Sequence, residues 1–195
     1  MSLYLDRLER ASERLPFVGT RVALLTGQSS FVSSALSPVQ ISFLHAVAPV
    51  GASVLEMGFP FDSSFLGVGF REAGMAGASL RNARQVGWAL GSERFRGIVR
   101  ARLGMLAGAA SRTILITGSC GLQLANVGWP GEVIALGPAC LGALRVRAYV
   151  VRGRGDGWSR LFYRGPVDRA CACGCGHLGY WESEEVRSIV KGILG

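Results

Sequence analysis

Short apolar runs rich in β-branched residues alternate along this chain with longer segments of helical periodicity. Helices are expected at residues 3–15, 38–48, 81–110 and 183–194. The runs that read as strands are residues 21–26, 54–57, 113–117, 133–136, 144–151 and 168–175. Strands that alternate with helices predict a three-layer α/β fold, with a mostly parallel central sheet and helices on both faces. With 195 residues and no linker-like stretch, the chain is expected to form one domain over residues 1–195.

The run at 113–117 ends in a group of small residues with a nucleophile in its middle, Gly118-Ser119-Cys120-Gly121. A strand that turns sharply into a helix presents the side chain at the turn, and nearby glycines allow that turn without a Cβ clash. Gly118 lies two positions before Cys120, and Gly121 follows it directly. The pattern therefore predicts Cys120 as a nucleophile. Ser119 is the rival, but the residue two positions before it is Thr117 rather than glycine.

A thiol nucleophile needs an imidazole to take its proton and a carboxylate to hold that imidazole. The chain has two histidines, of which His45 lies in the predicted helix 38–48 and is expected at the surface or in packing. His177 follows the last predicted strand, and Asp156 follows the strand at 144–151. Cys120, Asp156 and His177 are therefore expected to gather at the carboxyl ends of the strands.

Other carboxylates compete less well for the role of the acid. Asp168 stands at the start of the last predicted strand, and so at the opposite edge of a parallel sheet. Asp62 is a weaker alternative, and Glu182 suits the first turn of the closing helix, where the helix dipole favours a negative charge.

These elements together resemble the α/β-hydrolase superfamily. The resemblance is carried by the elbow at 118–121, by the strand and acid at 150–156, by Gly176-His177-Leu178, and by the run at 22–28. It implies a minimal member of that superfamily with a Cys120–His177–Asp156 triad. It also implies an oxyanion hole made by the backbone N–H groups of Gly121 and of Gln28 or Ser29.

The chain departs from the pattern of that family at three positions. Cysteine replaces the usual serine at the predicted nucleophile, Leu122 stands where a glycine is expected two positions after it, and Thr26 replaces a histidine before the oxyanion loop. Leu122 and the short chain favour the alternative of a non-catalytic hydrolase-like module that binds a ligand or a protein. The order of the three triad residues favours an enzyme.

The chemistry implied by a cysteine triad is acyl transfer through a thioester intermediate. We expect a thioesterase, acyltransferase or esterase that acts on a hydrophobic acyl thioester or ester and needs no cofactor. Phe59, Phe61 and Ser29 are candidates to line the substrate site, although the two phenylalanines also suit the core.

Charge and hydropathy indicate the environment and the partner. The net charge of +8 favours acidic or phosphate-bearing partners such as coenzyme A or an acyl-carrier protein, although solubility explains many basic surfaces as well. No nucleic-acid-binding motif accompanies the arginines, so nucleic acid is not expected as a partner. No apolar run approaches the roughly 18 residues of a membrane span, and the charged N-terminus does not resemble a signal peptide, which predicts a cytoplasmic location.

Five cysteines are an odd number, which disfavours a secreted disulfide framework. Cys140 is expected in the core. Cys171, Cys173 and Cys175 alternate along the last predicted strand, where they fit either small buried positions or a metal or redox role. The pattern lacks the paired spacing of a zinc site, so no metal site is predicted.

Overall fold

The computed structural model of the protein describes residues 2–28, 30–67, 69–70, 75–171 and 176–195. In this part of the chain, six strands form one sheet in the order β2-β1-β3-β4-β5-β6, and every neighbouring pair is parallel. The strands are β1 (Val18–Leu25), β2 (Ser53–Val54), β3 (Ala110–Gly118), β4 (Glu132–Leu136), β5 (Arg147–Gly153) and β6 (Arg169–Cys171). A parallel sheet requires crossovers, which explains why helices or long loops separate the strands along the chain.

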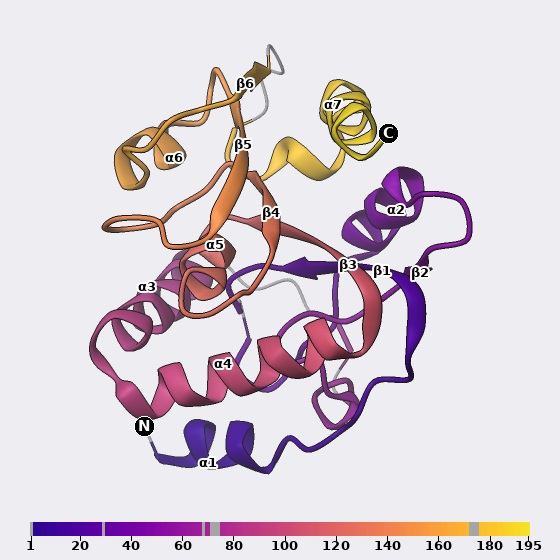
Figure 1. The fold of residues 1–195 in the computed structure, drawn as a ribbon. Coiled ribbons are helices and arrows are strands. Elements are labelled where there is room, and N and C mark those ends of the chain that lie inside the picture. The colour runs from indigo at the N-terminus through magenta and orange to yellow at the C-terminus, as the bar shows by residue number, and fades with distance from the viewer. Residues whose placement is uncertain (1, 29, 68, 71–74, 172–175) are drawn as a thin grey trace.

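Helices cover both faces of the sheet (Figure 1). One face carries α1 (Ser2–Arg10), α3 (Met75–Gly91), α4 (Glu93–Gly108), α5 (Gly121–Ala125) and α6 (Gly157–Phe162). The other carries α2 (Pro38–Val47) and α7 (Glu184–Leu194), which lie side by side. Two 3₁₀ turns, η1 (Ser63–Phe65) and η2 (Gly179–Trp181), complete the described elements. The predicted three-layer α/β fold is confirmed.

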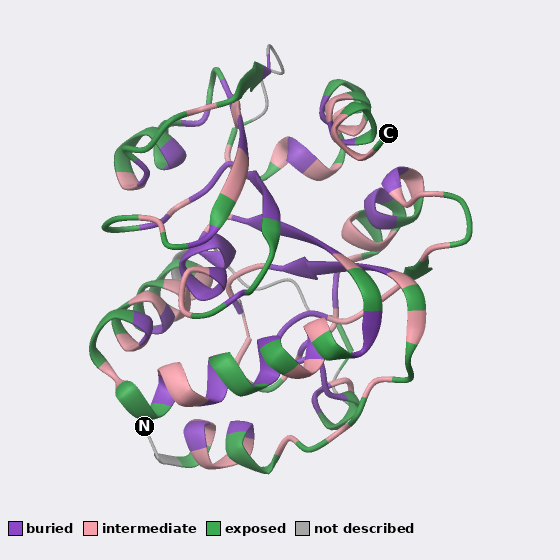
Figure 2. Ribbon diagram, viewed as in Figure 1, coloured by how far each residue is buried: buried purple, intermediate pink, exposed green. Residues whose placement is uncertain are grey.

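The alternation of side chains along the strands divides the interior into two cores. Val22 and Leu24 of β1 pack with α2 and α7, whereas Ala23 and Leu25 pack with the helices of the opposite face. Figure 2 shows the result as buried strands between helices whose outer surfaces are exposed. Because both faces of the sheet are covered, its strands read as continuous apolar runs, which is why they were recognisable in the sequence.

The helices differ from the predicted ones at several points. The expected helix at 81–110 is two helices, because Ser92 leaves the helical conformation and its side chain caps α4 by accepting a hydrogen bond from the Phe95 N–H. The first of them, α3, begins at Met75, earlier than the expected start of the helix at 81. The predicted start of α2 is confirmed: Ser37 and Gln40 form a capping box around its N-terminus.

In the described residues, no helix is both long and apolar enough to cross a membrane.

Candidate active site

The turn from β3 into α5 has an unusual backbone conformation at Ser119. Its φ is 51°, in the left-handed region that residues with a side chain seldom occupy. Two backbone hydrogen bonds hold the turn: the Ser119 N–H donates to the Leu136 carbonyl at 3.4 Å, and the Ser119 carbonyl accepts from the Ala139 N–H at 2.9 Å. A strained residue at the carboxyl end of a central strand is typical of a presented nucleophile.

The residue two positions after Ser119 allows the turn to pack tightly. A Cβ on Gly121 would lie 1.8 Å from the Leu25 carbonyl oxygen of β1, so only glycine fits there. Leu122, whose side chain seemed to obstruct this packing, is instead fully buried in the core. Thr117, two positions before Ser119, is also fully buried in β3, so threonine fits where we expected glycine to be needed.

Three side chains from three strand ends meet beside this turn. The Ser119 Oγ lies 2.8 Å from His177 Nε2. His177 Nδ1 lies 3.1 Å from both Asp156 Oδ1 and Asp156 Oδ2. The Asp156 carboxylate is completely buried, and the His177 side chain keeps 17% of its surface exposed. The expected contact between His177 and Asp156 is therefore present, but the side chain that meets the imidazole belongs to Ser119.

Asp156 is held from several sides. It is the N-cap of α6, where Oδ1 accepts the Ser159 N–H at 2.8 Å, while Oδ2 accepts the Tyr180 hydroxyl at 2.7 Å. Burial alone would raise the pKa of this carboxyl, but the hydrogen bonds from His177, Ser159 and Tyr180 outweigh it and hold the pKa below its ordinary value. Asp156 therefore faces the imidazole as an ionised carboxylate.

Cys120 does not face His177, which corrects our expectation. Its side chain is 3% exposed, and a Cβ on Gly27 would lie 2.2 Å from its sulfur, so the thiol packs against the loop after β1. Burial raises the pKa of this thiol to about 12, which keeps it protonated and unreactive at neutral pH. The left-handed turn at Ser119 separates the directions of the two neighbouring side chains, and a sequence does not display that backbone angle.

The predicted oxyanion donors change with the nucleophile. The residue that follows Ser119 is Cys120, and its backbone N–H donates to no backbone carbonyl among the residues that the structure describes. This N–H takes the place in which we expected that of Gly121. The Gln28 N–H is already engaged, since it donates to Gln85 Oε1 at 3.0 Å. Ser29 lies outside the described residues.

The Gln28 side chain is also tied into the structure. Its amide donates to the Phe59 carbonyl at 2.9 Å, and its oxygen accepts from the Gln85 amide at 3.2 Å and from the Tyr4 hydroxyl. Gln28 is therefore a buried anchor of the loop after β1 in this conformation.

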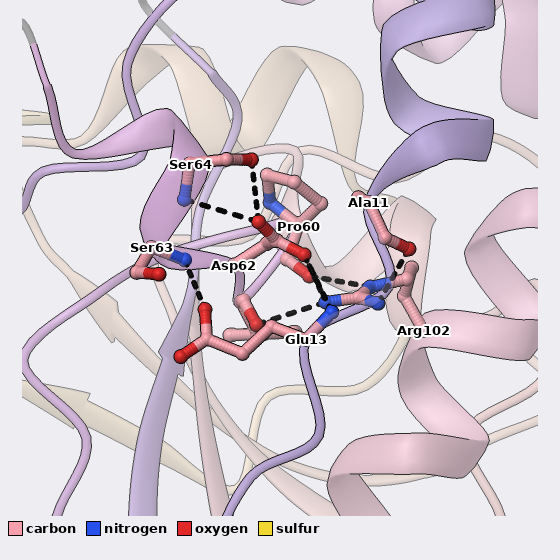
Figure 3. A network of polar contacts seen from close by, with 8 residues as sticks. Ala11, Glu13, Pro60, Asp62, Ser63, Ser64 and Arg102 are labelled. Atoms are coloured by element: carbon pink, nitrogen blue, oxygen red, sulfur yellow. Dashed lines mark hydrogen bonds and ion pairs between the residues drawn. The ribbon is translucent and has the colours of Figure 1, made fainter.

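Phe59 and Phe61 belong to the core, contrary to their expected role in binding substrate. They are 1% and 0% exposed and pack edge to face at 6.2 Å. Arg102 of α4 donates beneath them to the carbonyls of Pro60 and Phe61 at 2.7 and 2.9 Å (Figure 3). Segment 59–61 is thus a structural element fixed from α4.

Asp62, the weaker candidate for the acid, is part of the same network. Its carboxylate lies 3.5 Å from the Arg102 guanidinium and accepts the Glu13 N–H at 2.9 Å and the Ser64 N–H at 3.1 Å (Figure 3). Burial alone would raise the pKa of Asp62, but the hydrogen bond from the Ser64 hydroxyl, the two backbone hydrogen bonds and the charge of Arg102 together lower it below its ordinary value. Its role is structural.

The remaining candidates have ordinary structural roles. His45 pairs with Glu56 at 2.7 Å on the surface, and Asp168 accepts the Val150 N–H at 2.8 Å. Cys140 and Cys171 are buried, while Cys173 and Cys175 lie outside the described residues. Within the described ranges, no group of three or more His, Cys, Asp or Glu side chains is arranged to hold a metal ion.

An apolar cavity of about 650 Å³ lies between the loop after β4 and the segment that contains α6. Its lining includes Leu141, Leu144, Leu161 and Phe162, and begins at Cys140. The residue before Cys140 is Ala139, whose N–H binds the Ser119 carbonyl. The loop that walls this cavity therefore starts at the turn that carries the serine.

The sequence contained a signal for Ser119 that our glycine rule excluded. The stretch Thr117-Gly118-Ser119-Cys120-Gly121 has a small residue two positions before the serine and a glycine two positions after it. Comparison of the chain with models of known families, with curated proteins and with solved structures finds no match.

Proposed function

We propose that this protein is a small α/β-hydrolase-type enzyme that transfers acyl groups through Ser119, with His177 as general base and Asp156 as its orienting acid. The observation that carries the proposal is the continuous contact from the Ser119 hydroxyl through His177 to the buried Asp156, at 2.8 and 3.1 Å. The strained φ of Ser119 and the chain order Ser, Asp, His support it, because both are typical of this class of enzyme.

In the first half of the reaction, the Ser119 oxygen attacks the acyl carbonyl carbon while His177 Nε2 takes the hydroxyl proton. The carbonyl π bond breaks and its electrons form an oxyanion, which the backbone N–H of Cys120 is placed to stabilise. Collapse of this intermediate expels the alcohol or thiol, which takes the proton from His177. The Ser119 ester remains, and water or another acceptor then removes the acyl group by the same steps.

A serine nucleophile changes the expected balance between hydrolysis and transfer. A cysteine enzyme would store the acyl group as a thioester, whereas a Ser119 ester lies below a thioester substrate in energy. Acylation from a thioester therefore runs downhill, and hydrolysis of the resulting ester is a natural second step. We infer a thioesterase or esterase activity. Acyl transfer would be the variant of this reaction in which an acceptor other than water removes the acyl group from Ser119.

The substrate class follows from the apolar cavity and the charge. The 650 Å³ cavity is lined mainly by apolar side chains, which suit a hydrophobic acyl group, and the first residue of its lining, Cys140, follows Ala139 in the chain. The net charge of +8 favours a phosphate-bearing carrier such as coenzyme A or an acyl-carrier protein. No step requires a cofactor.

The experiment that tests the proposal is covalent labelling with a fluorophosphonate, followed by mass spectrometry of the intact protein and of its peptides. We expect one adduct on Ser119, with its loss in Ser119→Ala and strong slowing in His177→Ala. Cys120→Ala is the matched comparison, and it should still label because its thiol faces Gly27. Incubation with a panel of acyl thioesters would then identify the acyl preference by the mass gained.

Two outcomes would overturn the proposal. An adduct on Cys120 would restore the cysteine triad. No adduct on the folded wild-type protein would leave a non-catalytic binding module. The main sequence argument for that module was Leu122, and it no longer holds because Gly121 occupies the position that must be small.

A further inference from the structure

Tyr180 contacts the three side chains of the site at the Asp156 carboxylate. Its side chain in η2 is 1% exposed, and its hydroxyl lies between two partners: the Gly153 N–H at 2.8 Å and Asp156 Oδ2 at 2.7 Å. The ring thus joins the end of β5 to the carboxylate that follows it.

The chemistry of these groups fixes the direction of each hydrogen bond. The Gly153 N–H can only donate, so the Tyr180 oxygen accepts from it, and the single hydroxyl proton of Tyr180 points to Asp156. Burial and the neighbouring carboxylate raise the pKa of Tyr180, so this proton stays in place. The Ser159 N–H also can only donate, to Oδ1.

Because both carboxylate oxygens accept hydrogen bonds from fixed donors, Asp156 can offer His177 only an acceptor. His177 Nδ1 must therefore carry a proton, which leaves Nε2 of the neutral ring as the acceptor that faces the Ser119 hydroxyl. The Gly153 N–H thus fixes the direction of the Tyr180 hydroxyl proton, and this proton fixes Asp156 Oδ2 as an acceptor. The result is that Nε2 of His177 is the nitrogen that takes the proton of Ser119.

The position of Tyr180 is enforced from the end of β4. Gly137 has a φ of 51°, and a Cβ on it would lie 2.5 Å from Tyr180 Cε2 and 2.6 Å from Asp156 Oδ2. The backbone here runs directly against the ring and the carboxylate, so neither has room to turn away.

We propose that Tyr180 is a positioning residue of the site, whose hydroxyl orients the Asp156 carboxylate and thereby sets the tautomer and direction of His177. The inference rests on the proposed serine mechanism. Its structural part, the hydrogen bond from Nδ1–H of His177 to Asp156, exists whether or not the protein turns over a substrate.

The test compares Tyr180→Phe with Tyr149→Phe. Tyr149 is the control, because it is a half-buried tyrosine of β5 that packs in the core beneath α2 and α7 and does not line the apolar cavity. In Tyr180→Phe we expect fluorophosphonate labelling of Ser119 to slow by about ten- to a hundredfold, as for loss of a hydrogen bond to a charged group. Tyr149→Phe should label at the wild-type rate.

Two further readouts separate positioning from general damage. The acid limb of the labelling rate should move to higher pH in Tyr180→Phe, because Asp156 loses a donor and binds a protonated imidazole more tightly. The downfield proton NMR signal of the His177 Nδ1–H should shift or broaden, while Tyr149→Phe leaves it unchanged. If Tyr180→Phe does not fold, 3-fluorotyrosine at position 180 keeps the ring and donates more strongly, which should move the acid limb to lower pH.

The outcomes distinguish this inference from the proposed function. If wild-type protein labels on Ser119 but the Tyr180 variants match it in rate, pH profile and NMR signal, the role of Tyr180 is refuted and the triad stands. If wild-type protein does not label, the enzyme proposal fails. An Nδ1–H signal that still responds to Tyr180→Phe would in that case support the orienting contact by itself.

Discussion

The contact between α5 and β1 makes Gly121 the residue at which the fold of this site is most sensitive to a single methyl group. A Cβ at this position would lie 1.8 Å from the Leu25 carbonyl oxygen, 2.6 Å from the Leu25 carbonyl carbon and 3.1 Å from the Thr26 Cα. All three atoms belong to the backbone, and Leu25 is paired in the middle of the sheet with Thr117. No side-chain rotation can relieve the clash in Gly121→Ala.

The cost can be estimated from these distances. Ordinary carbon–oxygen contact requires the two segments to separate by roughly 1.5 Å, which would loosen the core that Leu122 and Leu124 fill. Overpacking of a core costs typically about 1–3 kcal/mol. Because the atoms that the new methyl group meets are all backbone atoms, the cost should lie at the upper end of this range. We expect Gly121→Ala to lower the free energy of unfolding by about 3 kcal/mol, or the melting temperature by roughly 6–12 °C.

Urea denaturation followed by tryptophan fluorescence measures this change, with Gly104→Ala as the matched control. Gly104 is an exposed glycine in α4 with nothing within 4 Å of its virtual Cβ, so alanine there should stabilise the helix by about 0.5–1 kcal/mol. Gly121→Ala should also slow the labelling of Ser119, because α5 carries the Cys120 N–H. A Gly121→Ala protein with unchanged stability would refute the close packing of the elbow.

Two further predictions concern buried groups. Arg102→Met should destabilise the protein by about 3–5 kcal/mol in urea denaturation, because it removes the buried positive charge beside Asp62 and the donor that the Pro60 and Phe61 carbonyls bind; a loss below about 1 kcal/mol would contradict this. The Cys120 thiol should resist iodoacetamide at pH 8 in the native protein, since with a pKa of about 12 only about one thiol in ten thousand is ionised. It should react readily in urea, and rapid alkylation in the native state, located by peptide mass spectrometry, would show that the thiol is exposed.

Much of the fold could be predicted because each strand is a short apolar run that both faces of the sheet bury. The carboxyl ends of these runs then located Asp156 and His177 through topology alone. The break at Ser92 was missed because the apolar periodicity continues from α3 into α4, and only the capping hydrogen bond to Phe95 shows where one helix ends. The start of α3 was missed because its composition, rich in glycine and alanine, resembles that of a loop.

The residue that faces His177 was misplaced by one position for a physical reason. Ser119 and Cys120 are adjacent, and which of them faces His177 depends on the φ of 51° at Ser119. The rule that the position two before a nucleophile must be glycine was too strict, since Thr117 fits there as a buried strand residue. The correct constraint lies after the serine, where Gly121 touches the backbone of β1.

The roles of Gln28 and Phe59 could not be predicted from their surroundings in the sequence. Gln28 bonds to Gln85, 57 residues away, and the segment that follows Phe59 is held by Arg102. Such contacts exist only after α3 and α4 have packed against the loops of β1 and β2. The residues that neighbour Gln28 and Phe59 in the sequence therefore do not indicate them.

The two buried aspartates show what distinguishes a functional carboxylate from a structural one in this fold. Asp62 and Asp156 are both N-caps that accept a nearby backbone N–H, and hydrogen bonds lower the pKa of both against the effect of burial. Their remaining partners differ. Asp62 faces the guanidinium of Arg102, which keeps its charge at every physiological pH, so the pair can only stabilise. Asp156 faces His177, whose ring can gain and lose a proton, so the same kind of buried carboxylate can support proton transfer from Ser119. The partner supplied by tertiary structure, rather than the carboxylate or its cap, therefore decides which aspartate can serve the proposed active site.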